Sequence, residues 1–287
     1  MPIRTALGLS ILIALLSFPA DALAAGTVRT SSVTGRLVVA ARPTTMSLHG
    51  PAGAVALNAA VTRQGRGVVV QRSVPGKDSG GWSFRVAPGG AGSRSVSAVL
   101  RCVSLRLPIG LTNARLNITT RSKGGMVLAP GATTTATLDC GRAWTATGYA
   151  LRGAGIRLAD VVPGAHGWRF TLENSGSSTA RAAVSARCLR SNVTATTSSG
   201  GTSAMSFAVS RPAQSNTLGP NAVTFRHSCG GRFSLATGSS VDPAASIELA
   251  VSSPAGPADG RWTFRHASGG DRVRSYLVCL SGATRFR

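Results

Sequence analysis

The chain has 287 residues, of which 31 are Lys or Arg and nine are Asp or Glu, so its formal net charge is +22 at pH 7. A charge this large creates a positive potential over the whole surface and predicts attraction to polymers rich in phosphate or carboxylate groups. No nucleic-acid reading motif occurs, and no run of arginines alternates with aromatic residues. These features exclude sequence-specific recognition of nucleic acids.

The first predicted element is a targeting segment at residues 1–24. It has one positive charge, at Arg4, followed by an apolar run and a small-x-small cleavage site that ends at Ala24. These are the parts of a Sec-type signal peptide, which is removed on export. A transmembrane anchor is the alternative, but the uncharged stretch Thr5–Ala20 is short for a bilayer span. We expect a bacterial protein that is secreted, periplasmic or on the cell surface, with no transmembrane segment in the mature chain.

Three similar phrases follow along the chain, at residues 81–103, 167–189 and 260–280. Each has a Trp, a Phe two positions later, a Gly-bearing turn, a strand-like run and a Cys. A second landmark precedes each phrase, and it is a Cys in the last two copies and Gly50 in the first. Self-similarity with a period of about 90 residues predicts three tandem homologous modules. We place the modules at residues 25–122, 123–213 and 214–287.

Each module has the pattern of antiparallel β structure. Trp and Phe at positions i and i+2 share one face of a strand, and the runs before the cysteines alternate in the same two-residue period. The stretches rich in Gly, Ser, Asn and Pro between these runs are typical of turns. No window after the signal peptide has a convincing helical period. We predict an all-β protein of three sandwich-like modules.

We interpret the aromatic pairs as module cores. Platforms for stacking sugars are the alternative, but only 5 % of the residues are aromatic, so three modules need these side chains for packing. The predicted core residues are Trp82, Phe84, Trp168, Phe170, Trp262 and Phe264.

Five cysteines in an exported protein predict disulfide bonds and one cysteine left over. The repeat favours bonds within modules, which would be Cys140–Cys188 and Cys229–Cys279. Cys102 is then a free, buried thiol, because the first module lacks the partner cysteine. A rival scheme joins neighbouring modules through Cys102–Cys140 and Cys188–Cys229 and leaves Cys279 unpaired. An intermolecular bond through the odd cysteine is a further alternative.

Motifs for catalysis or metal binding are missing from the sequence. It has no C-x-x-C, H-x-x-x-H, G-x-S-x-G or H-E-x-x-H motif and no phosphate-binding loop. His166 and His227 lie beside module landmarks, but no acidic residue recurs at one place in all three modules. We therefore expect no catalytic residues, no metal site and no cofactor.

The leading hypothesis is a non-catalytic protein, secreted or attached to the cell envelope, that binds polyanionic polymers or other acidic surfaces. The planar guanidinium of arginine suits both phosphate and carboxylate groups. Strand alternation and turn positions predict six outward arginines: Arg85, Arg101, Arg169, Arg187, Arg265 and Arg274. The alternatives are a secreted hydrolase or inhibitor acting on an extracellular polymer, and a partner-binding module of an exported complex in which Cys102 forms a mixed disulfide.

Overall fold

The structure is a computed structural model. It describes residues 27–63, 68–88, 94–217, 221–229, 235–243, 248–256, 259–266 and 272–281. For the strands between residues 235 and 266, only the backbone is described. The predicted signal peptide at 1–24 lies outside the described residues, and so do the side chains of Trp262, Phe264 and Arg265.

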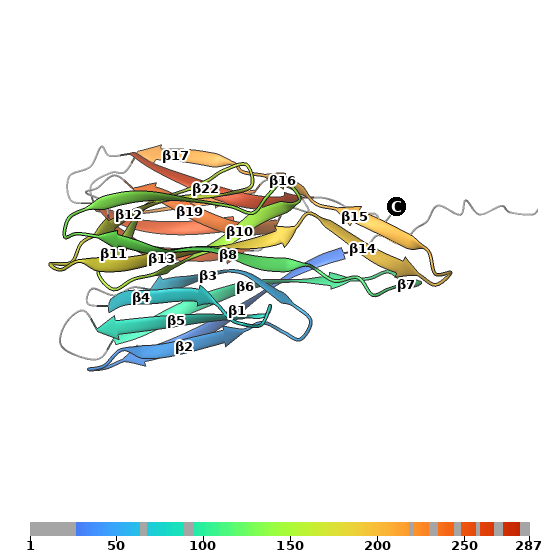
Figure 1. The fold of residues 1–287 in the computed structure, drawn as a ribbon, viewed down its shortest axis with the longest axis horizontal. Coiled ribbons are helices and arrows are strands. Elements are labelled where there is room, and N and C mark those ends of the chain that lie inside the picture. Colours follow the sequence, from blue (N-terminus) through green and yellow to red (C-terminus); the bar gives the residue numbers. More distant parts are fainter. Residues whose placement is uncertain are drawn as a thin grey trace, which may run out of the picture.

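The described chain is all-β, with antiparallel strands and no helix, which confirms the all-β, antiparallel part of the predicted fold. Six strands form a first set of two facing sheets, β1-β6-β3 and β2-β5-β4, with a hydrophobic core between them (Figure 1). Their bounds are β1 (Thr27–Val39), β2 (Thr44–His49), β3 (Val55–Arg63), β4 (Val68–Pro75), β5 (Gly81–Pro88) and β6 (Arg94–Arg106).

A second set has the same pairing scheme, in sheets β8-β13-β10 and β9-β12-β11. Its strands are β8 (Ile118–Leu128), β9 (Thr133–Asp139), β10 (Trp144–Arg152), β11 (Ile156–Pro163), β12 (Gly167–Asn174) and β13 (Ala180–Arg190). Thr- and Ser-rich runs such as that of β9 favour strand over helix, since their branched or short polar side chains suit a pleated surface.

A third set repeats the scheme once more, with its first strand divided into β16 and β17, which both pair with β22. Its sheets combine β16 and β17 with β22 and β19, and β18 with β21 and β20. The strands are β16 (Ala208–Ser210), β17 (Ala213–Thr217), β18 (Asn221–Ser228), β19 (Leu235–Pro243), β20 (Glu248–Gly256), β21 (Asp259–His266) and β22 (Arg272–Ser281).

A small extra sheet, β15-β14-β7, projects from one end of the molecule (Figure 1). It is built from β7 (Leu111–Thr112), β14 (Asn192–Thr197) and β15 (Thr202–Ser206), which belong to the two connections between the sets. The two connections therefore contain strands of their own, in addition to the first strand of the set that follows each of them.

Each of the first two sets encloses its aromatic pair. Trp82 and Phe84 on β5 are 1 % exposed, and Trp168 and Phe170 on β12 are fully buried. The facing strands β6 and β13 contribute small and branched apolar side chains to the same clusters. The i, i+2 spacing thus places both rings of a pair in the core between the two sheets.

A third hydrophobic cluster lies where the three sets meet. It contains the residue directly after the cysteine in each of the three phrases, namely Val103, Leu189 and Leu280. These side chains are at most 3 % exposed, and Leu57 of β3 and Met205 of β15 pack with them. The three sets therefore share an apolar centre in addition to their own cores.

The sets pack on one another in a closed order. β4 of the first set pairs with β10 of the second, which joins their sheets into the six-stranded sheet β2-β5-β4-β10-β13-β8. β11 of the second set contacts β19 of the third, and β20 of the third set contacts β3 of the first. The fourth strand of each set thus lies against the third strand of another set, and the series closes on itself.

The third strands β3, β10 and β19 also contact one another in the middle of the molecule. Each has a bulge at the same place, directly after Ala56, Ala146 and Ala236. At the first interface the backbones of β3 and β10 lie so close that a Cβ on Gly148 would collide with the carbonyl of Leu57. A glycine is therefore required at position 148.

Candidate functional site: a polar pocket and the exposed arginines

A pocket of about 520 Å³ opens at one end of the first set. Its walls are the β2–β3 turn at residues 49–55, the β4–β5 turn at residues 78–80, Leu105 of β6 and the linker residues 114–116. Glycines and alanines make up much of the lining, so the chemically active groups are few. They are the side chains of His49, Asp78 and Arg115.

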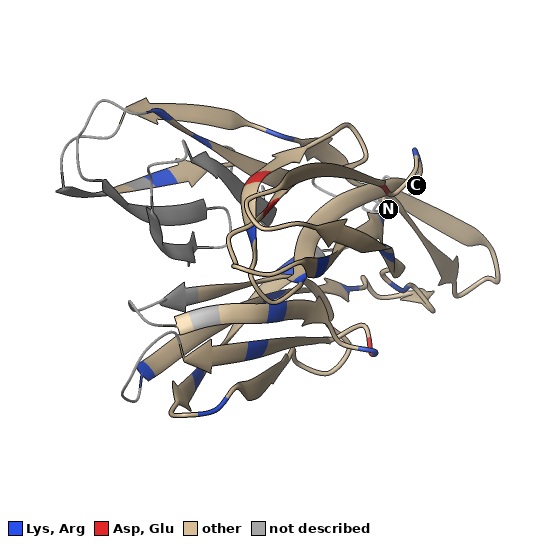
Figure 2. Cartoon of the chain, turned by 60° about the vertical axis from the view of Figure 1, so that its left-hand side comes forward, with Lys and Arg blue, Asp and Glu red and all other residues tan. Residues whose placement is uncertain are grey.

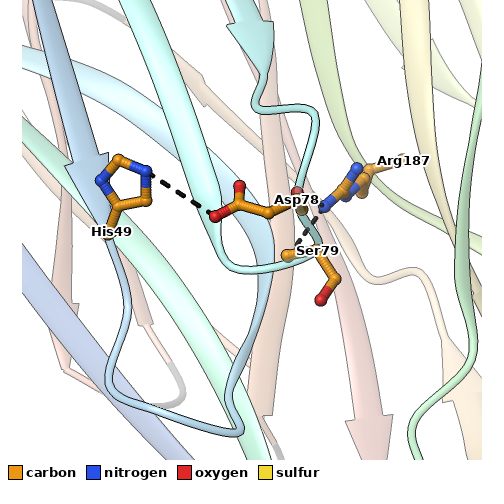
Figure 3. A network of polar contacts seen from close by, with 4 residues as sticks. All are labelled: His49, Asp78, Ser79 and Arg187. Carbon is orange, nitrogen blue, oxygen red and sulfur yellow. Dashed lines mark hydrogen bonds and ion pairs between the residues drawn. The ribbon is translucent and has the colours of Figure 1, made fainter.

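A histidine–aspartate contact lies at this pocket. His49 Nε2 is 3.7 Å from Asp78 Oδ2, and both side chains are more than half exposed, at 64 % and 59 %. Figure 3 shows that the Ser79 side chain points away from His49, so serine, histidine and aspartate do not form a proton relay here. The pair can bind small polar groups, but it has no nucleophile in line with it.

Arg187 of β13, in the second set, reaches the β4–β5 turn on which Asp78 and Ser79 lie (Figure 3). Its Nη2 donates to the carbonyl of Ser79 at 2.8 Å and its Nε to the carbonyl of Ala56 at 3.1 Å. Its Nη1 donates to Thr120 Oγ1 at 2.9 Å. This arginine therefore connects the first two sets through several charge-assisted hydrogen bonds.

The expectation that Arg187 and Arg101 face solvent is wrong, because they are only 5 % and 8 % exposed. Arg187 lies on the outer face of its own sheet, as the alternation predicts, but the first set covers this face. Burial lowers the pKa of Arg187 to about 10, while the nearby charge of Asp78 raises it. At neutral pH the guanidinium is still charged, and it cannot reach a polymer outside the protein.

The other predicted arginines have different surroundings. Arg85 on β5 and Arg274 on β22 are exposed. The side chain of Arg169 is 58 % exposed, but its Nη2 lies 3.8 Å from Asp160 Oδ2. Arg265 lies outside the described side chains.

Two further arginines lie beside Arg85, at positions that no local sequence pattern indicates. On β4, Arg72 is directly opposite Arg85, and Arg152 on β10 is directly opposite Arg72 from the other side. All three side chains are exposed. The three arginines stand in one row across adjacent strands, at the junction of the first two sets. We call Arg85, Arg72 and Arg152 the arginine row.

The cysteines form two disulfide bonds, Cys140–Cys188 and Cys229–Cys279, each with its Cα atoms 5.7 Å apart. The structure thus has the bonds within single sets and not the rival bonds between them. Cys102 is free and fully buried, and burial raises the pKa of its thiol to about 11. A thiol with this pKa is protonated at neutral pH and is a poor nucleophile.

A buried histidine–serine contact lies in the third set. His227 Nδ1 is 3.2 Å from Ser275 Oγ, and the two residues are 6 % and 0 % exposed. Burial lowers the pKa of His227, so the ring is held neutral. The Ser275 hydroxyl also lies 3.4 Å from the carbonyl of Gln214, to which it donates. Because neither residue is open to solvent, the contact stabilises the fold and does not offer a site for substrate.

In the part of the chain that the structure describes, no group of three His, Cys, Asp or Glu residues is arranged to hold a metal ion. Among the same residues, no helix of sufficient length and hydrophobicity to cross a bilayer is present. No protein-family model matches the chain, and no curated protein is significantly similar to it in sequence. Its function must therefore be argued from the chemistry of its surface.

Proposed function

We propose that this chain is an exported, non-catalytic protein that binds polyanionic polymers of the cell envelope or other acidic surfaces through its exposed arginines. One observation carries the proposal: Lys and Arg positions are spread over the strands and turns of the described chain, whereas Asp and Glu positions are few (Figure 2). Arg157 pairs with Glu173 and Arg169 with Asp160, but nine acidic side chains cannot neutralise 31 basic ones. Most guanidinium groups at the surface are thus left to interact with external anions.

We infer that the three strand sets are the three homologous modules indicated by the sequence. The shared pairing scheme, the bulges at equivalent places and the repeated cysteine and aromatic landmarks support this proposal. The first strands of the second and third sets begin at Ile118 and Ala208, so we propose module boundaries slightly before residues 123 and 214. Three modules that contact one another would hold the arginines at fixed positions in a single body.

Two disulfide bonds are compatible with an oxidising, extracellular compartment. Export through the signal peptide at 1–24 is part of the proposal, and the disulfides support it. In such a compartment, envelope phosphate polymers and acidic glycans are the polyanions within reach. The long-range field of a +22 chain would raise the local concentration of such polymers before any specific contact forms.

The proposal is tested by measuring the binding of the purified mature protein to inorganic polyphosphate, lipopolysaccharide, DNA and an acidic glycan across a salt series. We expect affinity to fall as salt increases, with a slope that reports the number of anionic groups contacted. Binding to none of the four at low salt would refute the proposal. If all four polymers dissociate over the same range of salt concentration, the binding is a general effect of net charge and not recognition of one polymer.

A further inference from the structure

In the part of the chain that the structure describes, the arginine row is the one place where exposed arginines stand directly opposite one another across three adjacent strands. Directly opposite residues on antiparallel strands point to the same face of a sheet, with their Cβ atoms about 5 Å apart. Arg72 is opposite Arg85 on one side and opposite Arg152 on the other. Adjacent strands are about 4.8 Å apart, so the row covers about 10 Å across the sheet. Three positive charges are therefore held side by side.

The register that makes the row is well supported by backbone contacts. The pair Leu151–Ser73 precedes Arg152–Arg72 in the ladder, and the amide of Gly153 donates to the carbonyl of Gln71 at 3.3 Å. The register of β4 against β5 shifts between Val70 and Arg72. This irregularity turns Arg72 to the outer face beside Arg85.

The row has no neutralising partner among the described residues, because neither an ion pair nor a hydrogen bond involves its three side chains. Like charges directly opposite one another destabilise a sheet. At the matching place in the second set, Asp160 on β11 stands opposite Thr171 on β12, so the repeated scaffold does not require arginines there. The row is thus a local feature of one junction and not a consequence of the fold.

The residues at the two ends of the row are small. Thr45 on β2 is opposite Arg85, and Ala183 on β13 is opposite Arg152. Neither provides an aromatic ring for stacking on a base or a sugar. Contacts at the row are therefore made by guanidinium groups to anionic groups, which favours a polymer whose charge lies in its backbone.

We propose that Arg85, Arg72 and Arg152 form a binding site for a linear phosphate polymer, which lies across the strands at the junction of the first two sets. Each guanidinium donates two hydrogen bonds to oxygens of one phosphate, and the spacing of the strands presents the three forks to successive parts of the chain. This inference rests on the proposed polyanion binding and assigns its site and its preferred chemistry.

The test compares three variants of the mature protein for binding to inorganic polyphosphate and to poly-glutamate. The first changes the whole row, Arg72→Ser, Arg85→Ser and Arg152→Ser. The control removes the same charge from three exposed arginines outside the row, Arg36→Ser, Arg121→Ser and Arg142→Ser. The third changes the row to lysine, which keeps the charge and removes the planar fork.

We expect the serine row variant to bind polyphosphate on the order of 100-fold more weakly at low salt, since hydrogen bonds to charged groups are the strong ones. The plot of its log affinity against log salt concentration should be less steep by about 2, at ~0.7 per lost phosphate contact. The scattered control should lose much less affinity, and the lysine variant should keep the slope while losing affinity. The midpoint temperature of thermal unfolding should be the same for the scattered control and the lysine variant as for the original protein. For the serine row variant it should be the same or higher, because the repulsion between three like charges is removed.

Several outcomes would overturn the inference. Equal losses in the row variant and the scattered control would show that only net charge matters. Poly-glutamate binding that depends on the row more strongly than polyphosphate binding would assign the site to carboxylates instead. If the original protein does not bind polyphosphate, the inference fails, and the proposed function fails with it if lipopolysaccharide, DNA and the acidic glycan are not bound either. Polyphosphate binding that survives loss of the row refutes only the site.

Discussion

Replacing Gly50 by cysteine should create a third disulfide bond, with Cys102. A Cβ placed on Gly50 would lie 2.5 Å from Cys102 Sγ, and the next nearest atoms are the Cβ of that cysteine and the carbonyl oxygen of Gly80. Gly50 therefore stands at the place of a disulfide partner, as Cys140 does for Cys188 in the second set. A small local shift converts the contact into a covalent bond.

The size of the effect follows from the length of the closed loop. Gly50 and Cys102 are 52 positions apart, compared with 48 and 50 for the two existing bonds. Restricting a loop of this length in the unfolded chain stabilises the folded state by about 4 kcal/mol in the chain-entropy description. We expect Gly50→Cys to raise the free energy of unfolding by up to this amount, and the gain should disappear in reductant.

The assay is a thiol titration of the denatured, unreduced protein, followed by denaturant unfolding with and without reductant. The original protein should show one thiol, from Cys102, and the variant none. Gly50→Ser is the matched control, because it adds the same crowding against Cys102 without a bond and should destabilise the protein. Two titratable thiols in the Gly50→Cys variant would refute the assignment of position 50 as the missing partner.

Four further predictions concern the core, the interface and export. Arg187→Met should lower the free energy of unfolding by about 3 kcal/mol or more, since it removes the charge-assisted hydrogen bonds of the guanidinium to the carbonyls of Ala56 and Ser79 and to Thr120. Cys102 should resist a thiol reagent in the native protein at pH 8, and stability should fall as pH rises from about 9 toward about 11, because the unfolded chain loses this proton first. Val161→Thr should be close to neutral, because its hydroxyl offers an acceptor to the indole N–H of Trp168, which has no partner among the described residues. Intact mass of the exported protein should place its N-terminus at Ala25, directly after the predicted cleavage site.

Each of these has a result that contradicts it. Unfolding of the Arg187 variant at the original denaturant midpoint would show that the interface does not depend on its hydrogen bonds. Rapid native labelling of Cys102 would show that the thiol is accessible. A loss for Val161→Thr equal to that of Val184→Thr, at another buried valine, would show that the indole gains nothing from the new hydroxyl. An exported chain that retains residues 1–24 would rule out cleavage of the signal peptide.

The contrast between Trp82 and Trp168 shows how far local sequence patterns reach. Both tryptophans are buried by the same i, i+2 alternation, which is a local property and could be predicted. Trp82 Nε1 donates to Ser73 Oγ at 2.9 Å, but Val161 occupies the matching place opposite the second aromatic pair. The neighbouring strand determines whether the indole N–H has a hydrogen-bond partner. Which strand is the neighbour cannot be read from the sequence of one repeated phrase.

The arginine row could not be predicted for the same reason. The outward position of Arg85 follows from its place next to Phe84 and requires only the alternation of β5. Arg72 depends on a shift of register in β4, and Arg152 depends on the pairing of β4 with a strand of another set. Pairing between sets joins residues far apart in the chain, so neither position carries a local signal. The composition indicates what kind of ligand to expect, but a place for it can be proposed only from the structure.

The residue directly before the cysteine of each phrase shows where strand alternation fails to predict exposure to solvent. Arg101, Arg187 and Val278 hold this position in the three sets, on the outer faces of β6, β13 and β22, and all three are buried. Arg187 bonds to the first set, and Val278 belongs to the core cluster of the second. In a closed arrangement the outer face of one set is the interface with another, so an outward strand position is not equivalent to exposure. Arginines can serve as ligands for a polymer only where no neighbouring set covers the sheet, as at the arginine row.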